Sequence, residues 1–240
     1  MKVDKIILTL NRIDQTSGDL FAAQLRGFGF VGIFSVFLIL ITGNIILPNM
    51  VALPVGALLV LLWVKLSHTP WQSIGYAKPK SWPGTIVIGI IFGVALKFLM
   101  KAIVMPLLGA DPVNQSYHFL AGNTAMLPAA IWAMLVAGFA EETVFRGYMF
   151  ERLTNLLGES RVARISIVLV TSVLFGFSHY MNQGWPGVEQ AIITGLVFGT
   201  IFSATKTVWL IMIAHSCFDL TALAMIYWNL ECTIAHLVFE

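Results

Sequence analysis

Long apolar stretches recur along this sequence, and several approach the length that a helix needs to cross a membrane. The hydrocarbon core of a bilayer is about 30 Å thick, so a crossing helix needs about 20 consecutive, mostly apolar residues. Hydrophobic residues make up 58% of the 240 residues and charged residues 11%, whereas a soluble domain is about 25% charged. The sequence therefore predicts an all-α, polytopic helical bundle that forms one integral membrane domain over residues 1–240.

The apolar stretches predict about seven or eight membrane-spanning helices, as in a multi-pass membrane protein. The predicted spans are residues 28–47, 51–66, 84–108, 124–157, 164–180, 188–204 and 207–229. The helix over 124–157 would be about 50 Å long at 1.5 Å per residue, so it must tilt, bend or project from the bilayer. The residues from 230 onward either extend the last helix or begin an eighth element.

Lys and Arg residues fall almost entirely on one side of the predicted spans. The turns on the opposite side contain no Lys or Arg: residues 48–50, 109–123, 181–187 and 230–240. This asymmetry predicts a cytoplasmic N-terminus, and the compact chain suggests a bacterial plasma (inner) membrane. Lys97 and Lys101 are the exceptions within the span 84–108. They could snorkel, face a water-filled cavity or pair with an acid on another helix. A net charge of +2 with no basic tract argues against a nucleic-acid partner.

One apolar helix carries ionisable residues in its interior, in the stretch Ala137-Gly-Phe-Ala-Glu-Glu-Thr-Val-Phe-Arg-Gly-Tyr-Met-Phe150. Charged residues inside a membrane helix are costly and by default suggest a functional site. Glu142 and Arg146 are four residues apart and can pair on one face of the helix. Glu141 is rotated by about 140° from Arg146, at about 100° per residue, so one acid can be neutralised while the other stays unpaired. The alternative is a purely structural ion pair between helices.

Two further predicted spans contain ionisable residues, each within a motif that has a four-residue step: Phe175-Gly-Phe-Ser-His179 and His215-Ser-Cys-Phe-Asp219. Counted from the basic residues at the cytoplasmic edges, the acids and histidines lie roughly 13 to 22 Å deep at 1.5 Å per residue. That depth is near the middle of a core about 30 Å thick. We therefore expect one buried site shared by three helices, with separate structural hydrogen bonds as the alternative.

Carboxylates and histidines together can hydrolyse a peptide bond without a covalent intermediate. A carboxylate near a histidine can take a proton from water, and a second histidine or a protonated acid can stabilise the oxyanion. The sequence contains neither Gly-x-Ser-x-Gly nor His-Glu-x-x-His, which argues against a serine esterase and an ordinary zincin. Two histidines and carboxylates from three helices could still hold zinc, so no cofactor is firmly implied.

Three blocks in this order, Glu141-Glu142-x-x-x-Arg146, Phe175-x-x-x-His179 and His215-x-x-x-Asp219, resemble the CPBP (Abi) family. This family contains the type II CAAX prenyl endopeptidases and the bacteriocin-processing proteins. The resemblance covers about residues 125–222. It implies a hydrolase, an intramembrane endopeptidase whose all-helical core encloses a conical cavity.

The resemblance also implies a role for each residue of the three blocks. Glu141 would be the general base, assisted by His179, while His215 and Asp219 would form the oxyanion site. The supporting residues would be Glu142, Arg146 and Phe175. The family often has Asn at the position of Asp219, and a carboxyl donates a hydrogen bond only when protonated. Asp219 could therefore orient His215 or bind a metal instead, although we favour a glutamate-type mechanism without an obligatory metal.

The sequence predicts the substrate class only in general terms. No feature identifies a prenyl pocket, so we expect a peptide or a membrane-protein segment that enters from the lipid bilayer. A non-catalytic peptide-binding or bacteriocin-immunity membrane protein of the same fold is the alternative. A proton-coupled transporter is a third possibility. The absence of an inverted repeat from the sequence argues against it. The oligomeric state cannot be predicted.

Overall fold

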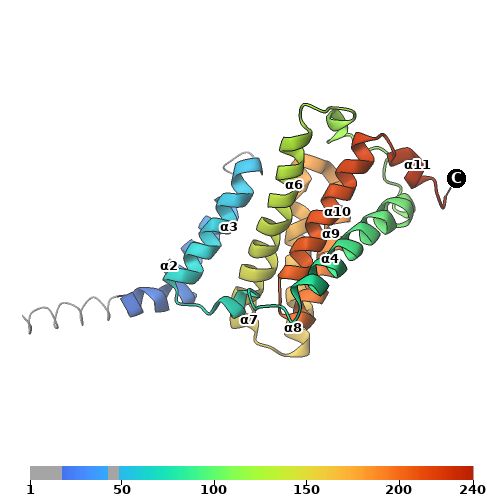
Figure 1. The fold of residues 1–240 in the computed structure, drawn as a ribbon. Helices are drawn as coiled ribbons and strands as arrows, with labels where there is room; N and C mark the ends of the chain where they lie inside the picture. The colour runs from blue at the N-terminus through green and yellow to red at the C-terminus, as the bar shows by residue number, and fades with distance from the viewer. Residues whose placement is uncertain (1–17, 43–48, 240) are drawn as a thin grey trace, which may run out of the picture. The chain divides into compact units, whose positions relative to one another are not determined.

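The computed structural model describes residues 18–42 and 49–239, and these residues are mostly helical with no strand among them (Figure 1). The chain divides into two compact units, Met1–Trp71 and Gln72–Glu240. An all-α fold is therefore confirmed. The prediction of a single domain over the whole chain stays a prediction.

The described part of the first unit consists of three helical segments. A helix over Gly18–Arg26 meets α2 (Phe30–Ile41) at an angle of 63°, and α3 (Asn49–Leu66) follows. The indole N–H of Trp63 in α3 donates to the carbonyl of Leu25 at 3.3 Å. This hydrogen bond ties the first helix of the unit to the third.

The second unit contains both long helices and short helical segments. In chain order they are α4 (Trp82–Leu99), η3 (Met100–Val104), α5 (Met105–Leu107), η4 (His118–Leu120), α6 (Leu127–Glu142), η5 (Thr143–Tyr148), α7 (Met149–Leu157), α8 (Arg161–Ser178), α9 (Tyr180–Thr205), α10 (Trp209–Tyr227) and α11 (Glu231–Ala235). A 3-10 turn, η2 (Trp71–Ile74), precedes them. The segments η3 and η5 are π-helical and continue α4 and α6 without a break.

Local sequence explains where several of these helices begin and end. The Ser81 hydroxyl accepts a hydrogen bond from the backbone N–H of Gly84, and Ser160 caps α8 in the same way. Gly158 follows α7 with a φ of 82°, a backbone conformation that favours glycine. Within α9, Gly184 leaves the helical conformation shortly before Pro186, so the helix is kinked there.

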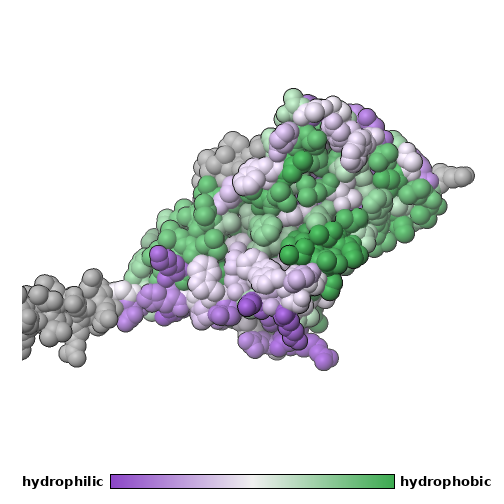
Figure 2. Space-filling view, viewed as in Figure 1, coloured by the Kyte–Doolittle hydropathy of each residue, from purple (hydrophilic) through white to green (hydrophobic). Residues whose placement is uncertain are grey.

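Five described helices are long and apolar enough to cross a membrane, or six if the bent pair of the first unit is one span. The five are Trp82–Leu107, Leu127–Leu157, Arg161–Ser178, Tyr180–Thr205 and Trp209–Tyr227. On the face shown in Figure 2, hydrophobic residues cover the middle of the second unit and hydrophilic residues gather at its ends. A multi-pass membrane bundle is therefore confirmed.

Within the described residues the spans number five or six, against the seven or eight predicted for the whole chain. Part of the predicted span 28–47 lies outside the described residues, since these omit 43–48. The apolar helix Leu53–Leu66 is shorter than the five spanning helices. The eighth element exists only as α11, which has 5 residues and is too short to cross a bilayer.

Helix α10 packs against both α4 and α6 (Figure 1), and α8 packs along α9. Small residues allow this close packing. A Cβ atom added at Gly93 of α4 would lie 2.1 Å from the Ala214 carbonyl oxygen of α10. One added at Gly138 of α6 would lie 2.3 Å from the Ser216 hydroxyl. These contacts hold α10 between the two helices that flank it.

We expect Gly93→Ala to lower the melting temperature of the detergent-solubilised protein by about 2–10 °C, because overpacking costs about 1–3 kcal/mol. The matched control is Gly199→Ala in α9, where the nearest atom to an added Cβ is a Val168 methyl group at 3.3 Å. The control should shift the melting temperature by less than about 2 °C, since helical Ala is favoured over Gly. Equal shifts in the two variants would show that the α4–α10 approach does not limit stability.

Candidate active site

The end of α6 and the π-helical segment that follows it carry the first block of ionisable residues. Glu141 and Glu142 are the last residues of α6, and Arg146 lies in the middle of η5. π-Helical turns are rare and occur frequently at functional sites. All three side chains are buried, with exposed fractions of 8%, 0% and 1%.

Glu142 connects Arg146 to His215 of α10. Its Oε1 accepts a hydrogen bond from Arg146 Nη1 at 2.8 Å and another from His215 Nδ1 at 2.7 Å. Because a carboxylate paired with a guanidinium can only accept here, the contact assigns a proton to Nδ1 of His215. The other imidazole nitrogen, Nε2, is then left to face the remaining acids.

Two carboxylates lie close to this nitrogen. Glu141 Oε2 and Asp219 Oδ2 are each 3.6 Å from His215 Nε2. The Glu141 side chain is 10% exposed and that of Asp219 is 21% exposed. A separation of 3.6 Å exceeds direct hydrogen-bonding distance, and a water-sized group could bridge it. Helices α6 and α10 thus bring Glu141, His215 and Asp219 together.

The aromatic ring of Phe175 links the third helix, α8, to this cluster. The Arg146 guanidinium lies over the ring, 4.5 Å from its centroid, a favourable cation–π geometry. The ring centroid is also 5.9 Å from that of His215 and 4.8 Å from that of His179. Phe175 therefore positions both the buried cation and the two imidazoles.

His179 lies at the edge of the cluster, just after the last residue of α8. Its Nδ1 is 2.8 Å from the Phe175 carbonyl oxygen, which can only accept, so Nδ1 donates and Nε2 carries the lone pair of the neutral ring. Within residues 18–42 and 49–239, no hydrogen bond or ion pair joins His179 to Glu141. The assistance of Glu141 by His179 stays a prediction.

Two residues of α9 contact the cluster although the sequence did not predict their contacts. The ring centroid of Phe198 in α9 lies 5.4 Å from that of His215. The same centroid lies 5.8 Å from the guanidinium carbon of Arg146. The Gly195 carbonyl accepts a hydrogen bond from Arg146 Nη2 at 3.4 Å. The pattern Gly195-x-x-x-Gly199 indicates a close helix approach, but it does not say which side chain reaches the carbonyl.

The ligand set suggested for zinc is not arranged as a metal site. Among the residues that the structure describes, no group of three or more His, Cys, Asp or Glu side chains is placed to hold a metal ion. His215 Nδ1 is bonded to Glu142, and Nε2 stands 3.6 Å from each neighbouring carboxylate oxygen. Metal analysis of the purified chain tests whether a metal binds.

Comparison with known proteins gives one family. Residues 123–221 match the family model described as Rce1-like, "Type II CAAX prenyl endopeptidase Rce1-like". All residues of the three sequence blocks lie within this range: Glu141, Glu142, Arg146, Phe175, His179, His215 and Asp219. The match confirms the predicted family over nearly the predicted range. Neither a curated protein nor a solved structure matches the chain significantly.

Proposed function

Because residues 123–221 match the Rce1-like family of type II CAAX prenyl endopeptidases, we propose that the chain is a glutamate-type intramembrane endopeptidase. Its substrate is a peptide or a membrane-protein segment. The observation that carries the proposal is the placement of Glu141 3.6 Å from Nε2 of His215, an imidazole whose other nitrogen is held by Glu142. Glu141 and His215 can each give or take a proton, and Glu142 holds His215 in place, an arrangement that suits general acid–base catalysis.

Glu141 is the general base in this proposal. Its carboxylate takes a proton from a water molecule as the water oxygen bonds to the scissile carbonyl carbon. The same proton then passes from Glu141 to the amide nitrogen, and the C–N bond breaks. His179, whose Nε2 is an acceptor, helps to orient the water from the edge of the cluster.

His215 and Asp219 act on the carbonyl oxygen. When protonated on both nitrogens, the His215 ring donates from Nε2 to the oxyanion while Glu142 accepts from Nδ1. Asp219, 3.6 Å from Nε2, orients this nitrogen. Glu142, Arg146 and Phe175 are positioning residues, because they contact His215 and each other rather than the reacting atoms.

The proposal is tested by profiling the peptides released from membranes that contain either the intact protein or the variant Glu141→Ala. We expect specific peptides to appear only with the intact protein. The matched control is Glu159→Ala, which removes an exposed glutamate from the turn between α7 and α8 and should leave the profile unchanged.

Three outcomes would contradict a proteolytic function. Profiles that do not differ between the intact protein and Glu141→Ala would refute hydrolysis at this site. A peptide that binds equally well to both proteins and is not cleaved would indicate the non-catalytic, immunity-type function instead. Proton flux in vesicles that disappears in Glu141→Gln would indicate a transporter.

A further inference from the structure

The two lysines inside the span of α4 and η3 have different surroundings, which settles the alternatives left open by the sequence. Lys101 Nζ lies 2.9 Å from Glu231 Oε1 and also donates to the carbonyl of Pro112. The backbone N–H of Asn114 donates to the same Glu231 oxygen at 3.1 Å. The charge of Lys101 is thus neutralised by an acid on another helix, α11.

Lys97 has no such partner although it is more deeply buried, with 6% of its surface exposed. Its Nζ donates to Gln190 Oε1 at 3.0 Å and lies 4.7 Å from the centroid of the Phe218 ring. Asp219 and Glu231 act on it electrostatically, but among the described residues no carboxylate lies within 4.0 Å of Nζ. A buried cation without a counter-ion is costly in a membrane protein and indicates a function.

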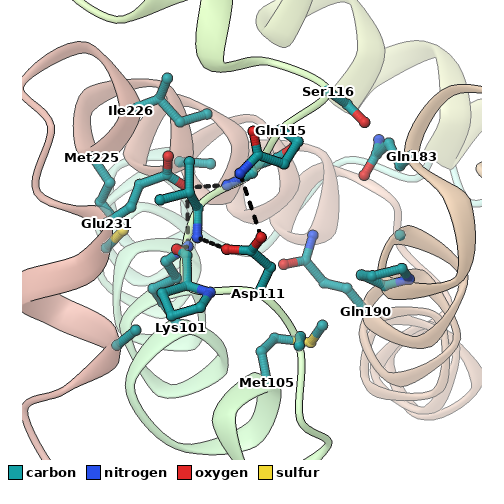
Figure 3. A pocket seen from close by; sticks show the side chains of 18 of the residues that line it. Lys101, Met105, Asp111, Gln115, Ser116, Gln183, Gln190, Met225, Ile226 and Glu231 are labelled. Atoms are coloured by element: carbon teal, nitrogen blue, oxygen red, sulfur yellow. Dashed lines mark hydrogen bonds and ion pairs between the residues drawn. The ribbon is translucent and has the colours of Figure 1, made fainter.

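Lys97 lines a cavity of about 150 Å³, and half of the other polar side chains in its wall are amides. Figure 3 shows Lys101 and Glu231 on one side of this cavity and Gln183 and Gln190 of α9 on the other. The remaining acid, Asp111, is exposed to solvent and accepts hydrogen bonds from Val113 N–H and the Gln115 side chain. The buried, unneutralised charge in the cavity is therefore positive.

The size of the cavity limits what it can hold. A water molecule occupies about 30 Å³ in the liquid, so 150 Å³ has room for about five waters. That space suits a carboxylate with a short side chain. It is well below the roughly 300–1,000 Å³ of sites that enclose a whole drug-sized ligand.

The cavity adjoins the candidate active site along α10. Ala222 lines the cavity and lies three residues after Asp219, on the same helical face. The two residues are thus separated by about one turn, or about 5 Å. An extended peptide advances about 3.3 Å per residue. A substrate whose scissile bond lies at Glu141 could therefore reach Lys97 within a few residues.

We propose that this cavity is a substrate-binding subsite in which Lys97 pairs with a carboxylate of the peptide, either its C-terminus or an acidic side chain close to the scissile bond. Gln190 holds the ammonium group in place, and the aromatic face of Phe218 stabilises it. This inference rests on the proposed endopeptidase activity. It makes Lys97 a specificity-determining residue outside the three blocks that carry the family resemblance.

The test compares cleavage of matched peptide pools by the purified, detergent-solubilised protein, followed by mass spectrometry. One pair of pools differs only in a free or an amidated C-terminus. A second pair is amidated throughout and differs only in Glu or Gln at one internal position. We expect the intact protein to cleave the carboxylate member of one pair about 10- to 150-fold faster, as for a charge-assisted hydrogen bond. The pair that shows the preference identifies the source of the carboxylate.

In Lys97→Met, which keeps a linear apolar side chain beside Phe218, the ratio should fall to about 1. Lys97→Arg keeps the charge and should retain a preference for the carboxylate. Lys80→Met removes an exposed lysine of the same unit and should keep the full preference. A ratio near 1 for both pairs in the intact protein, or an undiminished preference in Lys97→Met, would overturn the subsite.

A binding measurement separates this inference from the proposed function. Short acetylated peptides with a free or an amidated C-terminus are added to the detergent-solubilised protein, and the melting temperature is recorded. Stabilisation by the acid alone, lost in Lys97→Met, would support the subsite even if no pool were cleaved. An absence of cleavage would then count against the endopeptidase activity. Equal melting temperatures with acid and amide would count against the subsite.

Discussion

Glu141→Gln is expected to lower the rate constant of peptide cleavage by about 100- to 10,000-fold, the range for loss of a general base. Glutamine keeps the size and planar shape of the side chain but cannot take a proton from water. The Glu141 side chain is nearly buried and lies 3.6 Å from His215 Nε2, so no bulk solvent replaces its function. The measurement is the single-turnover rate on a peptide identified by membrane profiling, with the melting temperature recorded in parallel.

Asp219→Asn is the matched control for this prediction, because Asp219 Oδ2 lies at the same 3.6 Å from His215 Nε2. Asparagine can still contact the imidazole through its amide, and the family resemblance accepts Asn at this position. We expect the rate to change by less than about 10-fold, well below the loss of a base. A large loss in Asp219→Asn together with a small one in Glu141→Gln would exchange the roles of the two acids.

The contacts that sequence spacing predicted are those within single helices. The pairing of Glu142 with Arg146 follows from a four-residue step, and it is present at 2.8 Å. The depth estimate placed the acids and histidines at a similar level in the membrane. It rested on helix rise alone, so it contained no information about how each helix is rotated about its axis.

Rotation of the helices decides which side chains meet, and the sequence did not reveal it. Glu142 bonds to His215 as well as to Arg146, because α6 and α10 pack closely at Gly138 and Ser216. His179 contacts the cluster through the Phe175 ring, a contact that the four-residue step at the end of α8 allows but that says nothing of Glu141. The sequence also carries no marker for the π-helical turn around Arg146.

The partners of the buried lysines also could not be predicted from the sequence. The sequence identified Lys97 and Lys101 as unusual but could not assign them partners. Glu231, the partner of Lys101, lies in a short helix near the C-terminus that the sequence left undefined. Apolar length, by contrast, predicted four of the five spanning helices of the second unit within about three residues, because bilayer thickness fixes that length. The exception is α9, which begins at Tyr180 and includes the predicted turn 181–187.

Arg146→Met is expected to destabilise the protein by about 3–5 kcal/mol, the cost of removing one partner from a buried ion pair. Arg146 and Glu142 are 1% and 0% exposed, so solvent cannot screen the carboxylate that is left behind. The variant also loses the contact of the guanidinium with the Phe175 ring. The measurement is the free energy of unfolding in mixed micelles, where a folded and an unfolded population can both be quantified.

The double variant Glu142→Gln/Arg146→Met tests whether the uncompensated charge is the cause. It removes both charges, yet the Gln side-chain oxygen can still accept from His215 Nδ1. We expect the double variant to be about 1–3 kcal/mol more stable than Arg146→Met alone, since a neutral residue in a buried site needs no counter-ion. If the two substitutions instead destabilise the protein additively, Arg146 contributes mainly by packing on Phe175. The ion pair would then serve to fix the orientation of His215, and its loss would lower the cleavage rate more than the stability.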